Sequence, residues 1–189
     1  MKYTFGIIHR YRGSSQTDWY SGLKTLLEAD GHKVIIPDLP GDDKPRAVQW
    51  LPLLDRQFSD ADNLVLIGHS IGTRGALLYL EKYRKPTKLL FMVGALSNDM
   101  ANAERLGGEA ADFYTHKINP DGINEVAEKI VMVHSRDDPH VSYPGQAIVL
   151  ADELGAELLA YEDKGHFLGP QHSELIYSLL NQYLVQANE

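Results

Sequence analysis

The chain has 189 residues, 43% of them hydrophobic, with no cysteine and a formal net charge of −8. This length suits one domain with a full hydrophobic core and leaves little room for a large inserted cap. The absence of cysteine excludes disulfides, cysteine-ligated zinc and a thiol nucleophile, and the negative charge argues against binding to a nucleic-acid backbone.

The sequence gives no sign of a targeting or membrane segment. The short apolar run at residues 5–8 is broken by His9 and Arg10, so it does not form a secretory signal. Nowhere does the chain contain the run of about 18 apolar residues that a membrane-spanning helix needs. We therefore expect a soluble, cytoplasmic protein with neither a membrane nor a nucleic acid as partner.

Short β-rich segments alternate with segments of helical periodicity along the whole chain. In order, the predicted elements are strand 3–8, helix 17–30, strand 33–36, helix 45–58, strand 63–67, helix 72–84, strands 87–93 and 130–134, helix 144–154, strand 157–161 and helix 173–186. The strands are nearly continuous apolar runs, which is typical of a parallel sheet covered on both faces. The alternation predicts an α/β fold, a single open parallel sheet of about six strands with helices on both faces. Gly31 is expected to end the first helix in a left-handed conformation.

The most informative segment is the strand 63–67, which continues into the G-x-S-x-G sequence of residues 68–72. A serine on such a sharp strand-to-helix turn, a nucleophile elbow, has its hydroxyl above the edge of the sheet. Gly68 and Gly72 are expected there because the backbone and the helix crowd together. Ser70 is therefore the candidate nucleophile, and the N–H of Ile71 at the helix start is the first candidate oxyanion donor.

The one long irregular stretch comprises residues 96–121. It is interpreted either as a partly helical excursion near the site or as a disordered surface loop. In the first interpretation, Phe113 and Tyr114 form part of a substrate pocket. Trp19, near the start of the first helix, is a third candidate for the pocket wall.

A serine hydroxyl is a poor nucleophile unless an imidazole accepts its proton and an acid orients that imidazole. Asp138 follows the strand 130–134 and His166 follows the last strand, so both are expected at the same sheet edge as the serine. Asp138 is preferred to Asp137 because the sequence D-P-x-V places its carboxylate at the start of a turn. The alternatives are an Asx turn at Asp138, a surface role for His166, and Asp99 as the acid.

The loop after the first strand is expected to supply the second oxyanion donor. Our candidate is the N–H of Tyr11, with Arg10 as the alternative. Arg10 and Arg12 either bind an anionic group of the substrate or are solvated loop charges, and the second interpretation is favoured. The histidines do not form an H-x-x-x-H pair on a predicted helix, so neither a metal nor another cofactor is expected. His69 is expected to pack or to form a hydrogen bond beneath the nucleophile turn.

These residues resemble the α/β-hydrolase superfamily and, more narrowly, a family of small cap-less serine hydrolases that includes the retinoblastoma-binding serine hydrolase. The resemblance rests on the segments 18–20, 50–52, 68–70, 135–139 and 165–167, which read DWY, WLP, GHS, SRDDP and GHF. It implies a single α/β-hydrolase domain over residues 1–189, a triad of Ser70, Asp138 and His166, and esterase-type hydrolysis. The chain departs from the family after the first strand, where glycines are usual and this chain has Arg10 and Tyr11. It also lacks the L-x-C-x-E motif, so an association with pocket proteins is not expected.

We therefore expect a serine hydrolase that cleaves a small carboxylic ester or a related acyl compound through an acyl-enzyme. Thioesterase and peptidase chemistry stay open, because a triad does not identify its leaving group. A non-enzymatic protein-binding module on the same fold is the alternative from another class. The expected partner is a small-molecule acyl substrate, and the sequence leaves open whether the protein is a monomer or a dimer.

Overall fold

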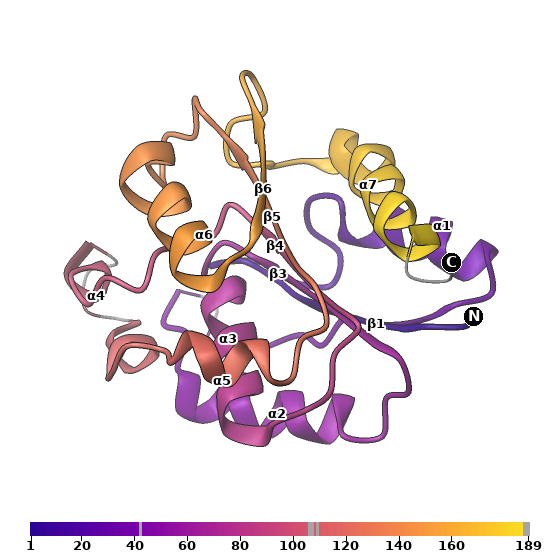
Figure 1. Cartoon of the computed structure of the whole chain (residues 1–189), viewed down its shortest axis with the longest axis horizontal. Helices are drawn as coiled ribbons and strands as arrows, with labels where there is room; N and C mark the ends of the chain where they lie inside the picture. The colour runs from indigo at the N-terminus through magenta and orange to yellow at the C-terminus, as the bar shows by residue number, and fades with distance from the viewer. Residues whose placement is uncertain (42, 106–107, 109, 187–189) are drawn as a thin grey trace.

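The centre of the molecule is a six-stranded parallel sheet (Figure 1). The computed structural model describes residues 1–41, 43–105, 108 and 110–186. The strand order is β2-β1-β3-β4-β5-β6, and each neighbouring pair is parallel. The bounds are β1 Thr4–Ile8, β2 Lys33–Ile35, β3 Leu64–His69, β4 Leu89–Val93, β5 Ile130–Ser135 and β6 Glu157–Tyr161. The predicted open parallel sheet is confirmed.

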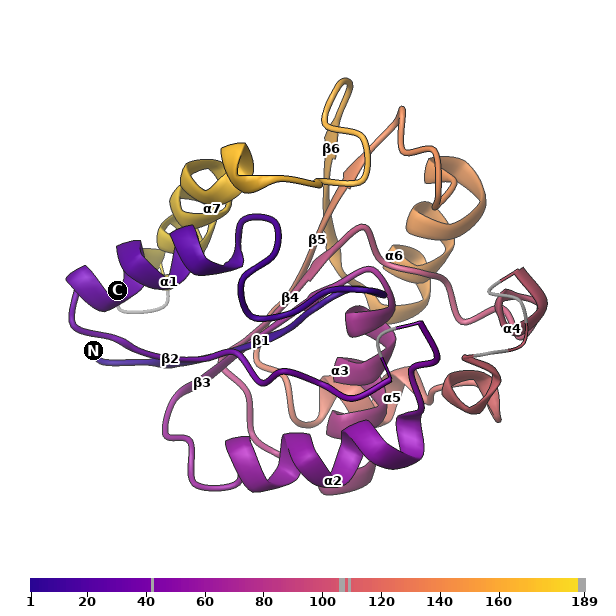
Figure 2. The same ribbon diagram turned by 180° about the vertical axis from the view of Figure 1, so that it is seen from behind.

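Helices cover both faces of the sheet (Figures 1 and 2). One face carries α1 (Tyr20–Ala29) and α7 (Ser173–Gln186), and the other carries α2 (Ala47–Phe58), α3 (Ile71–Tyr83), α5 (Pro120–Asn124) and α6 (Ile148–Leu154). The short helix α4 (Asn102–Arg105) lies farther out. Each helix on a strand-to-strand connection brings the chain back to start the next strand in the same direction, which a parallel sheet requires.

The central strands divide their side chains between two hydrophobic cores. In β3, Leu64 and Leu66 pack under α2 and α3, whereas Val65 and Ile67 pack under α1 and α7. The strands β4 and β5 alternate in the same way. Because successive side chains of a strand point to opposite faces, a strand covered on both sides must be apolar throughout. This explains the continuous apolar runs of the sequence.

The predicted helices differ from the observed ones mainly at their first residues. The first helix begins at Tyr20 rather than at residue 17, because residues 14–17 form a turn and Asp18 has a positive φ of 51°. The predicted helix 144–154 is a π-helical turn at Tyr143–Ala147 that continues into α6. Gly31 has a φ of 78° and donates its N–H to the Glu28 carbonyl, as expected of a left-handed cap.

A buried arginine anchors the irregular segment 96–121 to α3. Arg74 is fully buried and donates hydrogen bonds to the Asn98 side chain (2.6 Å) and to the carbonyls of Phe113 (2.6 Å) and His116 (2.5 Å). Its guanidinium also lies 4.9 Å from the centre of the Tyr114 ring. The described part of the segment contains α4, a 3-10 turn at Ala111–Tyr114 and the first residues of α5. Residues 106, 107 and 109 lie outside the described residues.

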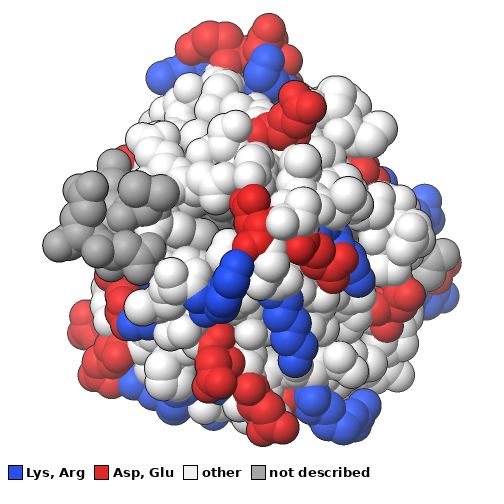
Figure 3. Space-filling model, turned by 90° about the vertical axis from the view of Figure 1, so that its right-hand side faces the viewer, with Lys and Arg blue, Asp and Glu red and all other residues white. Residues whose placement is uncertain are grey.

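The surface carries charges of both signs. On the face shown in Figure 3, acidic and basic side chains are interspersed and do not form one large patch of a single sign. Over the residues that the structure describes, no helix is long and apolar enough to cross a bilayer.

Arg74→Lys is expected to lower the free energy of unfolding by about 2–4 kcal/mol. A lysine ammonium offers its donors at one point, so it cannot reach all three acceptors, and buried carbonyls are left unpaired. Urea titration followed by circular dichroism measures the change. Arg56→Lys is the matched control, because Arg56 is an exposed arginine in the last turn of α2 and its replacement should change the free energy of unfolding by less than about 0.5 kcal/mol. Equal losses in the two variants would contradict the anchoring role of Arg74.

Candidate active site

Ser70 lies on a strained turn between β3 and α3. Its φ of 55° and ψ of −124° are unusual for a residue with a side chain, and its N–H donates to the Val93 carbonyl at 2.9 Å. A Cβ at Gly68 would lie 2.6 Å from the Thr73 Cα. One at Gly72 would lie 2.7 Å from the His9 carbonyl oxygen and closer still to that of Ile8. The turn therefore requires glycine at both positions, as the sequence predicts.

Asp138 and His166 form a buried pair at the carboxyl ends of β5 and β6. The His166 Nδ1 lies 2.7 Å from the Asp138 Oδ2, and the other Asp138 oxygen accepts the N–H groups of His140 (2.8 Å) and Val141 (3.0 Å). Burial by itself would raise the pKa of Asp138, but these hydrogen bonds outweigh it and hold the pKa below its usual range. The carboxylate therefore stays ionised, and it fixes the His166 ring with Nε2 left for the pocket.

The neighbouring aspartates have different roles. Asp137 accepts hydrogen bonds from the Ser135 hydroxyl (2.5 Å) and the Gly165 N–H (2.9 Å), so it ties the loop after β5 to the loop after β6. Asp99, the alternative acid, lies near the surface, where it pairs with Arg105 at 3.4 Å. Of the three aspartates, Asp138 alone contacts His166 within the described part of the chain.

Ser70 and His166 line the same small pocket. Its volume is about 190 Å³, and its remaining walls are Arg10, Tyr11, His140 and Leu168. Between described residues there is no direct hydrogen bond from the Ser70 hydroxyl to His166. In unliganded sites this contact is often long and tightens when substrate binds.

The three aromatic residues that we expected on the pocket wall do not line the pocket in the structure. Trp19 is fully buried against Tyr20 and His69, with ring centres 4.6 and 5.5 Å apart. Phe113 is fully buried against Trp50, and Tyr114 packs over the Arg74 guanidinium. The prediction was wrong because burial in the two cores gains more apolar contact for these rings than an open pocket would.

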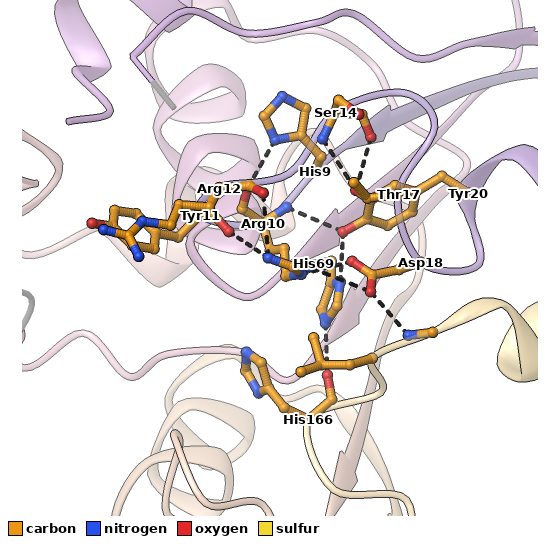
Figure 4. A network of polar contacts seen from close by, with 12 residues as sticks. His9, Arg10, Tyr11, Arg12, Ser14, Thr17, Asp18, Tyr20, His69 and His166 are labelled. Carbon is orange, nitrogen blue, oxygen red and sulfur yellow. Dashed lines mark hydrogen bonds and ion pairs between the residues drawn. The ribbon is translucent and has the colours of Figure 1, made fainter. Parts of the chain in front are cut away.

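Several hydrogen bonds hold the loop after β1 in place (Figure 4). The Arg10 carbonyl accepts hydrogen bonds from His9 Nδ1 (2.8 Å) and from the Gly13 N–H (3.0 Å). Since the C=O and N–H of a trans peptide point in opposite directions, these two bonds also fix the direction of the Tyr11 N–H. The Arg10 N–H donates to the Tyr20 hydroxyl at 3.1 Å, so the alternative oxyanion donor is already engaged.

The Arg10 side chain is not the solvated loop charge that we favoured from the sequence. Its Nε donates to Asp18 at 2.6 Å and its Nη1 to the Tyr11 carbonyl at 2.8 Å, and only 23% of the side chain is exposed. Arg10 is held in this way because the buried Asp18 carboxylate and the Tyr11 carbonyl replace the water that would otherwise bind its guanidinium. Arg12 is exposed and lies 5.2 Å from the centre of the Tyr11 ring.

Sequence reasoning missed Gly94 and His140. Gly94, directly after β4, has a φ of 58°, and a Cβ there would lie 3.1 Å from the His166 Cε1. Its position directly after the strand that neighbours the strand before Ser70 was a usable signal in the sequence. The His140 ring packs edge-on against His166 at 5.1 Å and lines the pocket, and no sequence pattern pointed to it.

His69 is fully buried beneath Ser70, as expected from the sequence. Its Nδ1 lies 2.6 Å from the Tyr20 hydroxyl and its Nε2 lies 2.8 Å from the His166 carbonyl oxygen. The pKa of His69 is lowered to about 3, mainly by burial and in smaller part by the nearby His166. His69 is therefore neutral at physiological pH. In the described part of the chain, no group of three His, Cys, Asp or Glu side chains could hold a metal ion.

Comparisons with known proteins agree on one family. The family described as "Serine hydrolase" matches residues 5–177. The protein YdeN of Bacillus subtilis (strain 168) is 30% identical over 183 residues, which cover 94% of each chain. The serine hydrolase RBBP9 of Rattus norvegicus is 27% identical over 159 residues, which cover 84% of this chain and 82% of that one.

Solved structures show the same fold. The crystal structure of the ydeN gene product from B. subtilis has a TM-score of 0.85 at 27% identity, over 98% of this chain and 100% of that one. Est1E from Butyrivibrio proteoclasticus with ferulic acid bound has a TM-score of 0.78 at 16% identity, over 97% of this chain and 88% of that one. The second likeness concerns the fold alone.

The free energy of unfolding is expected to fall as the pH drops from about 6.5 toward 3. The pKa of His69 lies near 3 in the native state, below its ordinary value of 6.5, so only the unfolded chain takes up that proton in this window. One such histidine contributes a slope of at most about 1.4 kcal/mol per pH unit. Urea titrations between pH 7 and 4 measure the slope, and His69→Gln should flatten it. An equal slope in parent and variant would show that His69 is not buried in its neutral form.

Proposed function

Because the chain belongs to the serine hydrolase family and has the α/β-hydrolase fold, we propose that it cleaves small carboxylic esters or related acyl compounds through an acyl-enzyme on Ser70. One observation carries the proposal. The Asp138–His166 pair, joined at 2.7 Å, lines the same pocket as a serine on a strained positive-φ turn. A structural role alone requires neither the strain at Ser70 nor the buried carboxylate beside His166.

In the proposed reaction, the Ser70 Oγ attacks the acyl carbon and its proton passes to the His166 Nε2. The bond to the leaving group then breaks, and His166 returns the proton to the leaving oxygen. Water repeats the sequence on the acyl-enzyme, releasing the carboxylic acid and restoring Ser70. Asp138 holds the Nδ1–H of His166 throughout and stabilises the imidazolium that forms in each half of the reaction.

The proposed oxyanion site consists of two backbone N–H groups. The Ile71 N–H begins α3, where the first N–H groups of a helix have no acceptor within the helix. The Tyr11 N–H is the second, and its direction is fixed through the Arg10 carbonyl. Such donors act on the charge that develops in the transition state, and each is worth about 10²–10³-fold in rate.

The expected substrates have short acyl groups. The pocket of about 190 Å³ is smaller than a typical ligand pocket, and Tyr11 and Leu168 are among the residues that line it. A long acyl chain would extend past Leu168 into solvent and gain little burial. The proposal therefore favours acetyl and butyryl groups and leaves the leaving group undefined, with thioesters and peptides as further candidates of the same class.

A fluorophosphonate probe is expected to label the parent protein covalently at Ser70. Ser70→Ala should abolish labelling, because the probe bonds only to an activated serine. Asp138→Asn should slow it on the order of 10³- to 10⁴-fold, since an amide does not stabilise the imidazolium. Ser178→Ala, an exposed serine on α7, is the matched control and should label as the parent does. A parent that takes no label would favour the non-enzymatic binding module on this fold.

A series of p-nitrophenyl esters is expected to give kcat/KM values that fall with acyl length. The acetate and butyrate esters should exceed the dodecanoate ester by at least about tenfold, because the small pocket cannot bury the additional methylenes and they add no binding energy to the transition state. Initial rates measured for every ester at the same low substrate concentration and the same detergent concentration give the series. A maximum at eight carbons or longer would overturn the assignment to short acyl groups.

A further inference from the structure

A buried chain of hydrogen bonds joins the loop after β1 to the loop after β6 (Figure 4). We call residues 9–13 the oxyanion loop and residues 163–169 the base loop. The Arg10 N–H contacts the Tyr20 hydroxyl at 3.1 Å, that hydroxyl lies 2.6 Å from His69 Nδ1, and His69 Nε2 lies 2.8 Å from the His166 carbonyl oxygen. These hydrogen bonds thus connect the loop after β1, the helix α1, the strand β3 and the loop after β6 through the core.

The direction of each hydrogen bond follows from the chemistry of its ends. The His166 carbonyl only accepts, so His69 must carry its proton on Nε2. The neutral His69 ring then accepts at Nδ1, which makes the Tyr20 O–H the donor there. The remaining lone pairs of the Tyr20 oxygen accept the Arg10 N–H. One arrangement of protons satisfies all four groups.

The two central groups of this chain are shielded from solvent. Tyr20 and His69 are both fully buried, and the Trp19 ring packs against each of them. A buried donor or acceptor without a partner is costly, so removing the Tyr20 hydroxyl would leave the Arg10 N–H and His69 Nδ1 unsatisfied. The backbone of the oxyanion loop would then have to move to find another acceptor.

Asp18 links the same two loops by a second route. Its carboxylate accepts from Arg10 Nε at 2.6 Å and from the Gly169 N–H at 2.9 Å, and its side chain is only 5% exposed. The positive φ of 51° at Asp18 turns the chain so that Tyr20 can enter the core just beyond it. The oxyanion loop and the base loop are therefore tied twice, once by a charged pair and once by the buried chain.

We propose that Tyr20 and His69 are positioning residues, which hold the Tyr11 N–H and the His166 ring in register on either side of Ser70 without touching substrate. The inference rests on the proposed function and extends it to two residues of the core. Arg10 precedes Tyr11 directly, and the carbonyl that His69 holds belongs to His166 itself. Displacing either loop weakens contacts made in the transition state more than contacts made in the bound substrate.

Tyr20→Phe tests the proposal on the intact protein. It keeps the ring in the core and removes only the hydroxyl. We expect kcat for p-nitrophenyl acetate to fall about ten- to a hundredfold with KM changed less than about twofold. Tyr79→Phe is the matched control, since the Tyr79 hydroxyl is also buried and has no hydrogen-bond partner in the described residues. Its kcat should stay within about twofold of the parent value.

Variants of His69 separate positioning from simple loss of structure. His69→Gln keeps an N–H donor for the His166 carbonyl and an acceptor for Tyr20, whereas His69→Leu keeps neither. We expect His69→Gln to retain at least about tenfold more kcat than His69→Leu, measured at a temperature where circular dichroism shows both fully folded. Equal kcat in these two folded variants would overturn the positioning role of His69.

The outcomes for Tyr20 distinguish this inference from the proposed function. A parent that neither turns over esters nor takes up a fluorophosphonate overturns the proposed function, and the inference fails with it. An active parent with an equally active Tyr20→Phe overturns the inference alone. A rise in KM at constant kcat would also overturn it, because that pattern belongs to a residue that contributes uniform substrate binding.

Discussion

The close approach of α3 to the end of β1 is the constraint on which the rest of the site depends. The first turn of α3 lies so near the carbonyls of Ile8 and His9 that only glycine fits at position 72. Such contact forces Ser70 into a positive φ and directs the first N–H groups of α3 toward the space above the sheet. The two apolar cores stabilise that strain, because β1 and β3 are buried on both faces and cannot separate. The strained turn at Ser70 is thus a consequence of how tightly the sheet and its central helix pack.

The parallel order of β3, β4, β5 and β6 then decides which loops meet at Ser70. Every strand in this order ends at the same edge, so the loops after β4, β5 and β6 supply Gly94, Asp138 and His166 to one place. Asp138 can be buried there as an ion because two backbone N–H groups and His166 replace its water. Gly94 leaves the space that the His166 ring fills.

The elements that carry the site and the packing around the site differ in how far the sequence predicts them. The strands, the main helices and the order of Ser70, Asp138 and His166 are predictable, because periodicity and loop position are local properties of the chain. The pocket wall was not, since Trp19 and Phe113 could face either the pocket or the core, and only the tertiary packing decides between them. Likewise, the hydrogen bond between His69 and His166 joins residues 97 positions apart, and no spacing rule encodes it. Gly94 is an intermediate case. Its position directly after a strand can be read from the sequence, but its contact with the His166 ring cannot.

The charges around the site explain why a histidine can lie directly under the turn that holds Ser70. The His69 and His166 rings are 5.3 Å apart, so a proton on His69 would repel the imidazolium that the proposed reaction forms on His166. Burial keeps His69 neutral, and the Tyr20 hydroxyl donates a hydrogen bond to its Nδ1, which therefore needs no proton. Arg10 brings a cation to the same region, but Asp18 pairs with it and reduces its field at the pocket. Asp138 therefore supplies the charge that opposes the imidazolium of His166, and the side chains of His9 and Arg10 hold the loop after β1 together with the Gly13 N–H.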